Sequence, residues 1–131
     1  MDKLKMKLFK TLILKYMKEH IVITTVLIFL ICSIICNIAS ELIIGTPYYN
    51  DIVHIYPIAI LSSILDPNGI SKAIMGIVGA IVAISTDVLI GFIIGLIISK
   101  IEKIRDKSLI IVPILAAVYF IVICFQCMPI I

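Results

Sequence analysis

Charged residues are scarce in this sequence, at 15% of the chain, whereas apolar residues make up 63% and the mean hydropathy is +1.28. A soluble domain of 131 residues cannot hide so much apolar surface, because about half of its residues must face water. The composition therefore excludes an ordinary soluble protein. Together with the short length, it predicts one integral membrane domain that covers residues 1–131.

The sequence also lacks the short motifs that mark common catalytic sites. It contains no glycine-rich phosphate loop, no nucleophile elbow and no metal-binding helix motif. His20 and His54 have no ligand-like spacing to any cysteine. We therefore expect no metal and no cofactor, and we do not expect an enzyme.

Long apolar runs are what the sequence does contain. The runs 21–44, 70–99 and 108–131 are each long enough to cross about 30 Å of hydrocarbon as a helix. The segment 52–65 is also apolar, but as a helix it would reach only about 21 Å. It ends at a strong turn signal, Asp-Pro-Asn-Gly at 66–69.

Basic residues gather beside these runs in two segments. The first, 1–20, reads as a basic amphipathic interfacial helix, with Met6, Phe9, Leu12, Ile13, Tyr16 and Met17 on its apolar side. The second is the link 100–107. Basic clusters that abut hydrophobic spans indicate contact with anionic lipid headgroups, so we expect no nucleic-acid partner. We predict a multi-pass protein of the cytoplasmic membrane with a cytoplasmic N-terminus.

The positive-inside rule also bears on the number of spans. If 52–65 crossed the bilayer, the link 100–107 would lie on the opposite side from the basic N-terminus. We therefore predict an all-α membrane protein with three transmembrane helices and a short re-entrant or interfacial helix, and four transmembrane helices are the alternative. His54 lies in the short helix near Tyr56, and we interpret it as structural.

Asp87 is the single ionisable residue in the interior of the longest apolar run, 70–99, because Lys72 lies at its start. A carboxylate in hydrocarbon costs about 2.5 to 3.5 kcal/mol even on a lenient insertion scale, so its side chain should face protein or water. Counting helical rise from the basic ends places Cys32–Ser33 and Tyr119–Phe120 at the depth of Asp87. We predict a hydrogen bond from Tyr119 to Asp87, with Asn37 as a further polar candidate in the first span.

Small residues share one side of the same run at spacings of three or four. They are Ala73, Gly76, Ala80, Ala83, Gly91, Gly95 and Ser99, and Asp87 falls within their stripe. Small residues let a second helix approach closely. We predict helix packing along this stripe, with a second copy of the chain or another membrane protein as the partner.

The four cysteines offer one more candidate. Cys124 and Cys127 have C-x-x-C spacing, and Cys36 lies at a depth similar to that of Cys124. No basic residue nearby would favour the reactive thiolate, so we interpret these cysteines mainly as packing residues and keep a redox role as an alternative.

Three hypotheses about function result. The first is an assembly subunit that packs through the small-residue stripe. The second is a small oligomeric transporter or channel in which Asp87 binds an ion or proton. The third is a membrane thiol oxidoreductase that uses Cys124 and Cys127.

Overall fold

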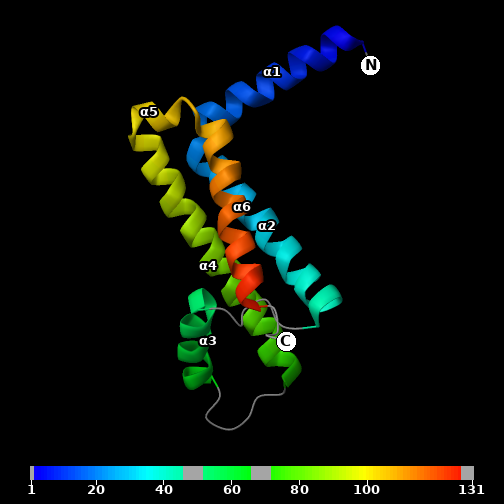
Figure 1. The fold of residues 1–131 in the computed structure, drawn as a ribbon, viewed down its shortest axis with the longest axis vertical. Coiled ribbons are helices and arrows are strands. Elements are labelled where there is room, and N and C mark those ends of the chain that lie inside the picture. Colours follow the sequence, from blue (N-terminus) through cyan, green and yellow to red (C-terminus); the bar gives the residue numbers. More distant parts are fainter. Residues whose placement is uncertain (1, 46–51, 66–71, 128–131) are drawn as a thin grey trace.

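The computed structural model describes residues 2–45, 52–65 and 72–127. Every element in these ranges is helical (Figure 1). In chain order the elements are α1 (Lys3–Glu19), α2 (Ile21–Ala39), the π-helical turn η1 (Ser40–Ile44), α3 (Ile52–Leu65), α4 (Lys72–Lys100), α5 (Glu102–Arg105) and α6 (Ser108–Cys127).

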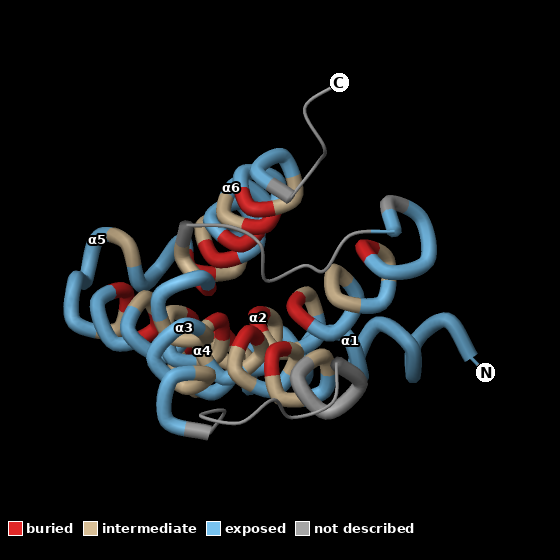
Figure 2. Tube along the Cα trace, turned by 90° about the horizontal axis from the view of Figure 1, so that it is seen from below, coloured by how far each residue is buried: buried red, intermediate tan, exposed pale blue. Residues whose placement is uncertain are grey.

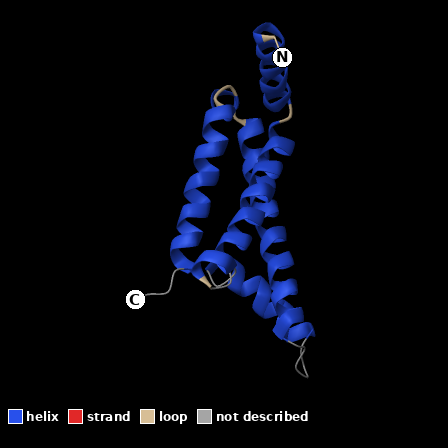
Figure 3. Cartoon of the chain, turned by 90° about the vertical axis from the view of Figure 1, so that its right-hand side faces the viewer, coloured by secondary structure: helices blue, strands red, loops and turns tan. Residues whose placement is uncertain are grey.

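Helices α2, α4 and α6 form an elongated bundle in which α4 runs antiparallel to α2 and α6 (Figures 1 and 3). Within the described residues, three stretches are long and apolar enough to cross a membrane: Ile21–Ile43, Gly76–Lys100 and Ser108–Gln126. Helix α3 contributes only a shorter apolar stretch, Val53–Ile64. The predicted fold class, three long helices with a short one and a preceding N-terminal helix, is confirmed. The chain is a small multi-pass helical membrane protein.

Large apolar side chains on the outer surface agree with this class. Ile31 on α2, Ile97 on α4 and Ile121 on α6 are all exposed. Figure 2 shows the buried positions on the faces that the three helices turn toward one another. A soluble monomer rarely exposes apolar surface of this extent, whereas lipid solvates it.

The core lies between the three long helices. Phe29 of α2, Ala83 of α4 and Phe120 of α6 belong to one buried cluster, together with Ala116 and Ile123. Helix α2 packs chiefly on α4, and α6 lies against both. Small residues on α4 permit the close contact, because bulky side chains there would hold the backbones apart.

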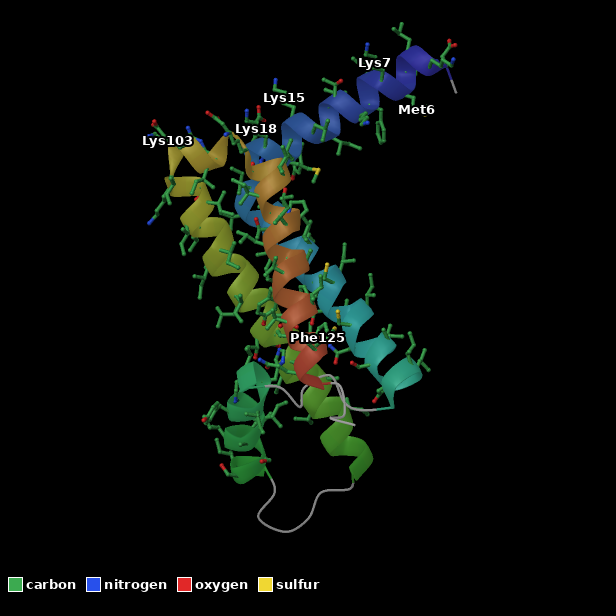
Figure 4. The ribbon with its side chains drawn as sticks, in the orientation of Figure 1. Met6, Lys7, Lys15, Lys18, Lys103 and Phe125 are labelled. Carbon is green, nitrogen blue, oxygen red and sulfur yellow. The ribbon has the colours of Figure 1, made fainter. Side chains whose placement is uncertain are left out.

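Helix α1 leaves the bundle at an angle and has no buried residue (Figures 1 and 3). Lys18 in its last turn lies 3.8 Å from Asp106 in the link after α5, measured from Nζ to Oδ1. Figure 4 shows Lys15, Lys18 and Lys103 at the same end of the bundle. Both basic segments therefore lie at one end, which is the arrangement that the three-span prediction requires.

The far end of α2 closes with a wide turn. The backbone N–H of Gly45 donates to the carbonyl of Ser40 at 2.9 Å, a π-type bond over five residues. Gly45 has φ of +72°, a left-handed conformation that glycine adopts without the steric penalty of a side chain. The helix ends there for this reason.

Helix α3 occupies the half of the bundle opposite the basic segments. It begins beside the middle of α4 and runs toward the far end (Figure 1). His54, in its first turn, contacts Asp87 near the midpoint of α4. The first turn of α3 therefore lies deep in the bundle, at the level of the only acidic residue of α4.

The helix bounds differ slightly from those predicted. The predicted span 70–99 is observed as Lys72–Lys100, and the predicted link 100–107 contains the short helix α5. The turn signal at 66–69 and the last residues of the predicted span 108–131 lie outside the described residues.

Candidate functional site

A fully buried carboxylate, that of Asp87, forms the centre of the site. Asp87 lies on α4 about 20 Å along the helix axis from Lys100 at its end. This distance places the carboxylate near the middle of the candidate span Gly76–Lys100. Its surroundings therefore decide whether a charge can exist at this depth.

Three other helices each contribute a polar side chain to this carboxylate. The Ser33 hydroxyl on α2 donates to Oδ2 at 2.5 Å, and the Tyr119 hydroxyl on α6 donates to Oδ1 at 2.7 Å. Nε2 of His54 on α3 lies 3.0 Å from Oδ1 and donates when that nitrogen carries a proton. The predicted hydrogen bond between Tyr119 and Asp87 is present.

Close approach of α2 brings Ser33 into range. A Cβ built on Gly91 would lie 2.7 Å from the side chain of Phe29, so that position tolerates only glycine without a shift. A Cβ on Gly95 would lie 3.0 Å from the backbone of Val22 and 3.2 Å from the side chain of Thr25. The antiparallel helices therefore meet at intervals of four residues.

The same register continues to the carboxylate. Ser33 follows Phe29 by one turn along α2, and Asp87 precedes Gly91 by one turn along α4. Ala83, a further turn away on α4, is also fully buried. The small-residue stripe therefore packs against α2 of the same chain between Ala83 and Gly95.

The other end of the stripe is more open. Gly76 has no described atom within 4 Å of an added Cβ, and Ala80 is only half-buried. The side chain of Ala73 lies outside those that the structure describes.

Aromatic rings hold Tyr119 in place. The rings of Phe29 and Tyr119 have centroids 5.5 Å apart, and Tyr119 meets Phe120 edge to face at 5.0 Å. Such aromatic pairs stabilise a fold by more than the burial of their apolar area alone would. Packing therefore fixes the position of the Tyr119 ring, and the Tyr119 hydroxyl donates to the carboxylate of Asp87.

Asn37 belongs to the surroundings of the site. Its Nδ2 donates to the backbone carbonyl of Ser33 at 2.9 Å, one helical turn back on α2. Because it bonds the residue that itself bonds Asp87, Asn37 supports the position of Ser33.

The charge balance of the site depends on one shared proton. Asp87 and His54 are both fully buried, and together they are neutral when they hold one proton between them. Lysine and arginine side chains that the structure describes lie in α1 and at 100–107, toward one end of the bundle. A bare carboxylate or a lone imidazolium at this depth would pay a large desolvation cost, whereas the pair with one proton carries no net charge.

His54 is the residue that sequence reasoning undervalued. The sequence favours a structural role for His54 near Tyr56, and the structure places its ring against Asp87. The available signal was an ionisable side chain in an apolar segment. Counting helical rise places Ser33 at the depth of Asp87 but does not predict its hydrogen bond to the carboxylate.

Two of the cysteines contact each other, and the side chain of a third is not described. Sγ of Cys36 and Sγ of Cys124 lie 3.8 Å apart. The side chain of Cys127 is outside the described part, so C-x-x-C pairing stays a prediction. Among the described residues no group of three or more His, Cys, Asp or Glu side chains could hold a metal ion.

Comparisons with known proteins assign no family to the chain. No protein-family model, curated protein or solved structure matches the chain. The functional argument therefore depends on the geometry of the site alone.

Proposed function

We propose that this membrane protein binds a proton at the Asp87–His54 pair and belongs to the class of small ion- or proton-coupled transporters or channels. The observation that supports this is the fully buried contact between Nε2 of His54 and Oδ1 of Asp87, at 3.0 Å. Ionisable residues within a membrane most often mark ion or proton pathways.

The roles of the side chains follow from their contacts. Asp87 and His54 hold the proton between them, since Nε2 of His54 lies 3.0 Å from Oδ1 of Asp87. Ser33 and Tyr119 donate to the carboxylate and stabilise its ionised form. Helix packing alone would require only uncharged donors and acceptors, so the histidine is the feature that favours proton chemistry.

Several neighbouring groups bear on proton binding at this pair. Tyr119 on α6 and Cys36 on α2 are ionisable neighbours of Asp87. The described cationic side chains lie at the end of the bundle that carries α1 and α5. We place that end at the cytoplasmic side, in contact with anionic lipid headgroups, because basic segments are retained there.

Infrared spectroscopy of the purified protein in lipid tests proton binding. The carboxylic acid C=O band of Asp87 should appear and disappear with pH, and Asp87→Asn should remove it. His54→Gln should move the midpoint of this titration, because the carboxyl group loses its ionisable partner. Ser85→Ala is the matched control, since Ser85 is exposed on the same helix and its hydroxyl donates to the backbone carbonyl of Ile81 at 2.8 Å.

Transport is tested in vesicles loaded with a pH-sensitive dye. Under an imposed membrane potential, Asp87→Asn should lower proton uptake at least about tenfold, the usual scale for a lost proton-transfer group. Ser85→Ala should leave it unchanged. Equal uptake by the folded Asp87→Asn variant and the parent protein would show that the carboxyl group only holds the helices together.

An assembly subunit is the second candidate, and one observation favours it. The stripe is covered by α2 at Gly91 and Gly95, whereas no described atom lies within 4 Å of a Cβ added at Gly76. A second copy of the chain would therefore pack at Gly76 and Ala80. Gly76→Leu should then shift the oligomeric state in detergent toward the monomer, and an unchanged state would reject this surface.

A further inference from the structure

The contact between Cys36 and Cys124 is a second feature that the proton-binding proposal does not use. Their sulfur atoms lie 3.8 Å apart, although the two residues are far apart in the chain. Both side chains are half-buried rather than sealed in the core. Each reaches the other from a different helix, α2 and α6.

A shallow apolar pocket borders the two thiols. Its other lining residues are Ala117, Phe120, Ile121 and Phe125. Phe125, the neighbour of Cys124, is exposed and lies toward the end of the bundle opposite Lys103 (Figure 4). An apolar pocket that opens on the lipid-facing surface admits neutral, lipid-soluble molecules in preference to charged ones.

We propose that Cys36 and Cys124 are a redox modification site that forms an intramolecular disulfide joining α2 to α6. Both S–H bonds break and one S–S bond forms, and the two thiols release two protons and two electrons. A neutral two-electron acceptor of the quinone class takes up both and becomes the quinol. The sulfurs need to close by about 2 Å to reach bonding distance, which side-chain rotation supplies.

The position in the bundle favours oxidation. The pair lies at the end opposite the basic segments, which is the side away from the reducing cytoplasm under the topology proposed above. The bond would also fasten together the two helices that supply Ser33 and Tyr119 to Asp87. Oxidation would therefore stiffen the polar cluster without touching it.

This inference stands apart from the C-x-x-C hypothesis. That hypothesis pairs Cys124 with Cys127, whereas the observed neighbour of Cys124 is Cys36. It is also independent of whether Asp87 and His54 bind a proton.

Thiol counting on the full chain in lipid membranes tests the site. Membranes are treated with diamide, a neutral two-electron oxidant that takes up both hydrogens, then quenched, denatured and alkylated before and after reduction. In the Cys32→Ser/Cys127→Ser background, two thiols should be protected until reduction, and the protein should remain a monomer. Adding Cys36→Ser should abolish the protection within the monomer.

Peptide mapping of the parent protein identifies the bond. A peptide pair joining residues 36 and 124 is expected. A bond between Cys124 and Cys127 would overturn the proposal, as would two thiols that stay fully alkylatable after oxidation. Because alkylation follows denaturation, burial of the thiols cannot imitate a disulfide.

Discussion

Nε2 of His54 lies 3.0 Å from Oδ1 of Asp87, although the two residues are separated by 33 positions in the chain. The contact joins the first turn of a short helix to the middle of the longest one. It gives a carboxylate at mid-membrane depth an ionisable partner that can share its proton.

Removing the carboxylate should destabilise the bundle. Asp87→Ala leaves Ser33, His54 and Tyr119 without this acceptor, and we expect a loss of about 3 kcal/mol in the free energy of unfolding. Asp87→Asn keeps an acceptor oxygen and should cost less. Unfolding in detergent, followed by circular dichroism, measures both. A loss equal to that of the exposed control Ser85→Ala would contradict the central role of Asp87.

The tight contact between Gly91 and Phe29 should be sensitive to a single methyl group. Gly91→Ala places a Cβ 2.7 Å from Phe29 and should cost about 1–3 kcal/mol. Gly76→Ala on the same helix serves as the control, because no described atom lies within 4 Å of its added Cβ, and it should be nearly neutral or slightly stabilising.

A double-mutant cycle identifies the cause. Phe29→Leu should relieve part of the penalty of Gly91→Ala, because the Leu side chain lacks the rigid ring beside the added methyl group. Strict additivity of the two changes would place the strain elsewhere.

The contact of His54 should hold α3 on the bundle. His54→Leu removes the bond to Asp87 and should raise amide hydrogen exchange in 52–65 by about tenfold or more, which corresponds to the loss of a hydrogen bond to a charged group. His20→Leu is the matched histidine control, because His20 bonds the backbone of Tyr16 in an exposed position. Unchanged exchange in 52–65 would mean that apolar packing alone retains α3.

The number of crossings should be readable from side-specific labelling. Single cysteines at Lys10 and Lys103, introduced into a cysteine-free background, should label from the same side of the membrane. Three crossings put them on one side, whereas a crossing by α3 would put them on opposite sides. Leu42→Cys and Ser63→Cys supply the second pair, since they share a side only if α3 does not cross.

Much of the fold could be predicted from the sequence because hydropathy and helical period are local properties. The apolar runs determined three long helices and a shorter one, and the small-residue stripe determined which side of α4 faces protein. Depth counted along straight helices even placed Ser33 and Tyr119 at the level of Asp87. These inferences need only rise per residue and angle per residue.

Only the tertiary structure decided which side chains meet. Ser33, His54 and Tyr119 lie on three different helices, and their convergence on Asp87 depends on the rotation and depth of each helix against the others. The position of α3 was the hardest feature to predict from the sequence, because a short helix can enter the bilayer, lie on it or cross it with similar hydropathy. The contact of Cys36 with Cys124 was likewise set by the packing of α6 on α2, since contacts between distant segments are a property of the docked helices and not of local sequence.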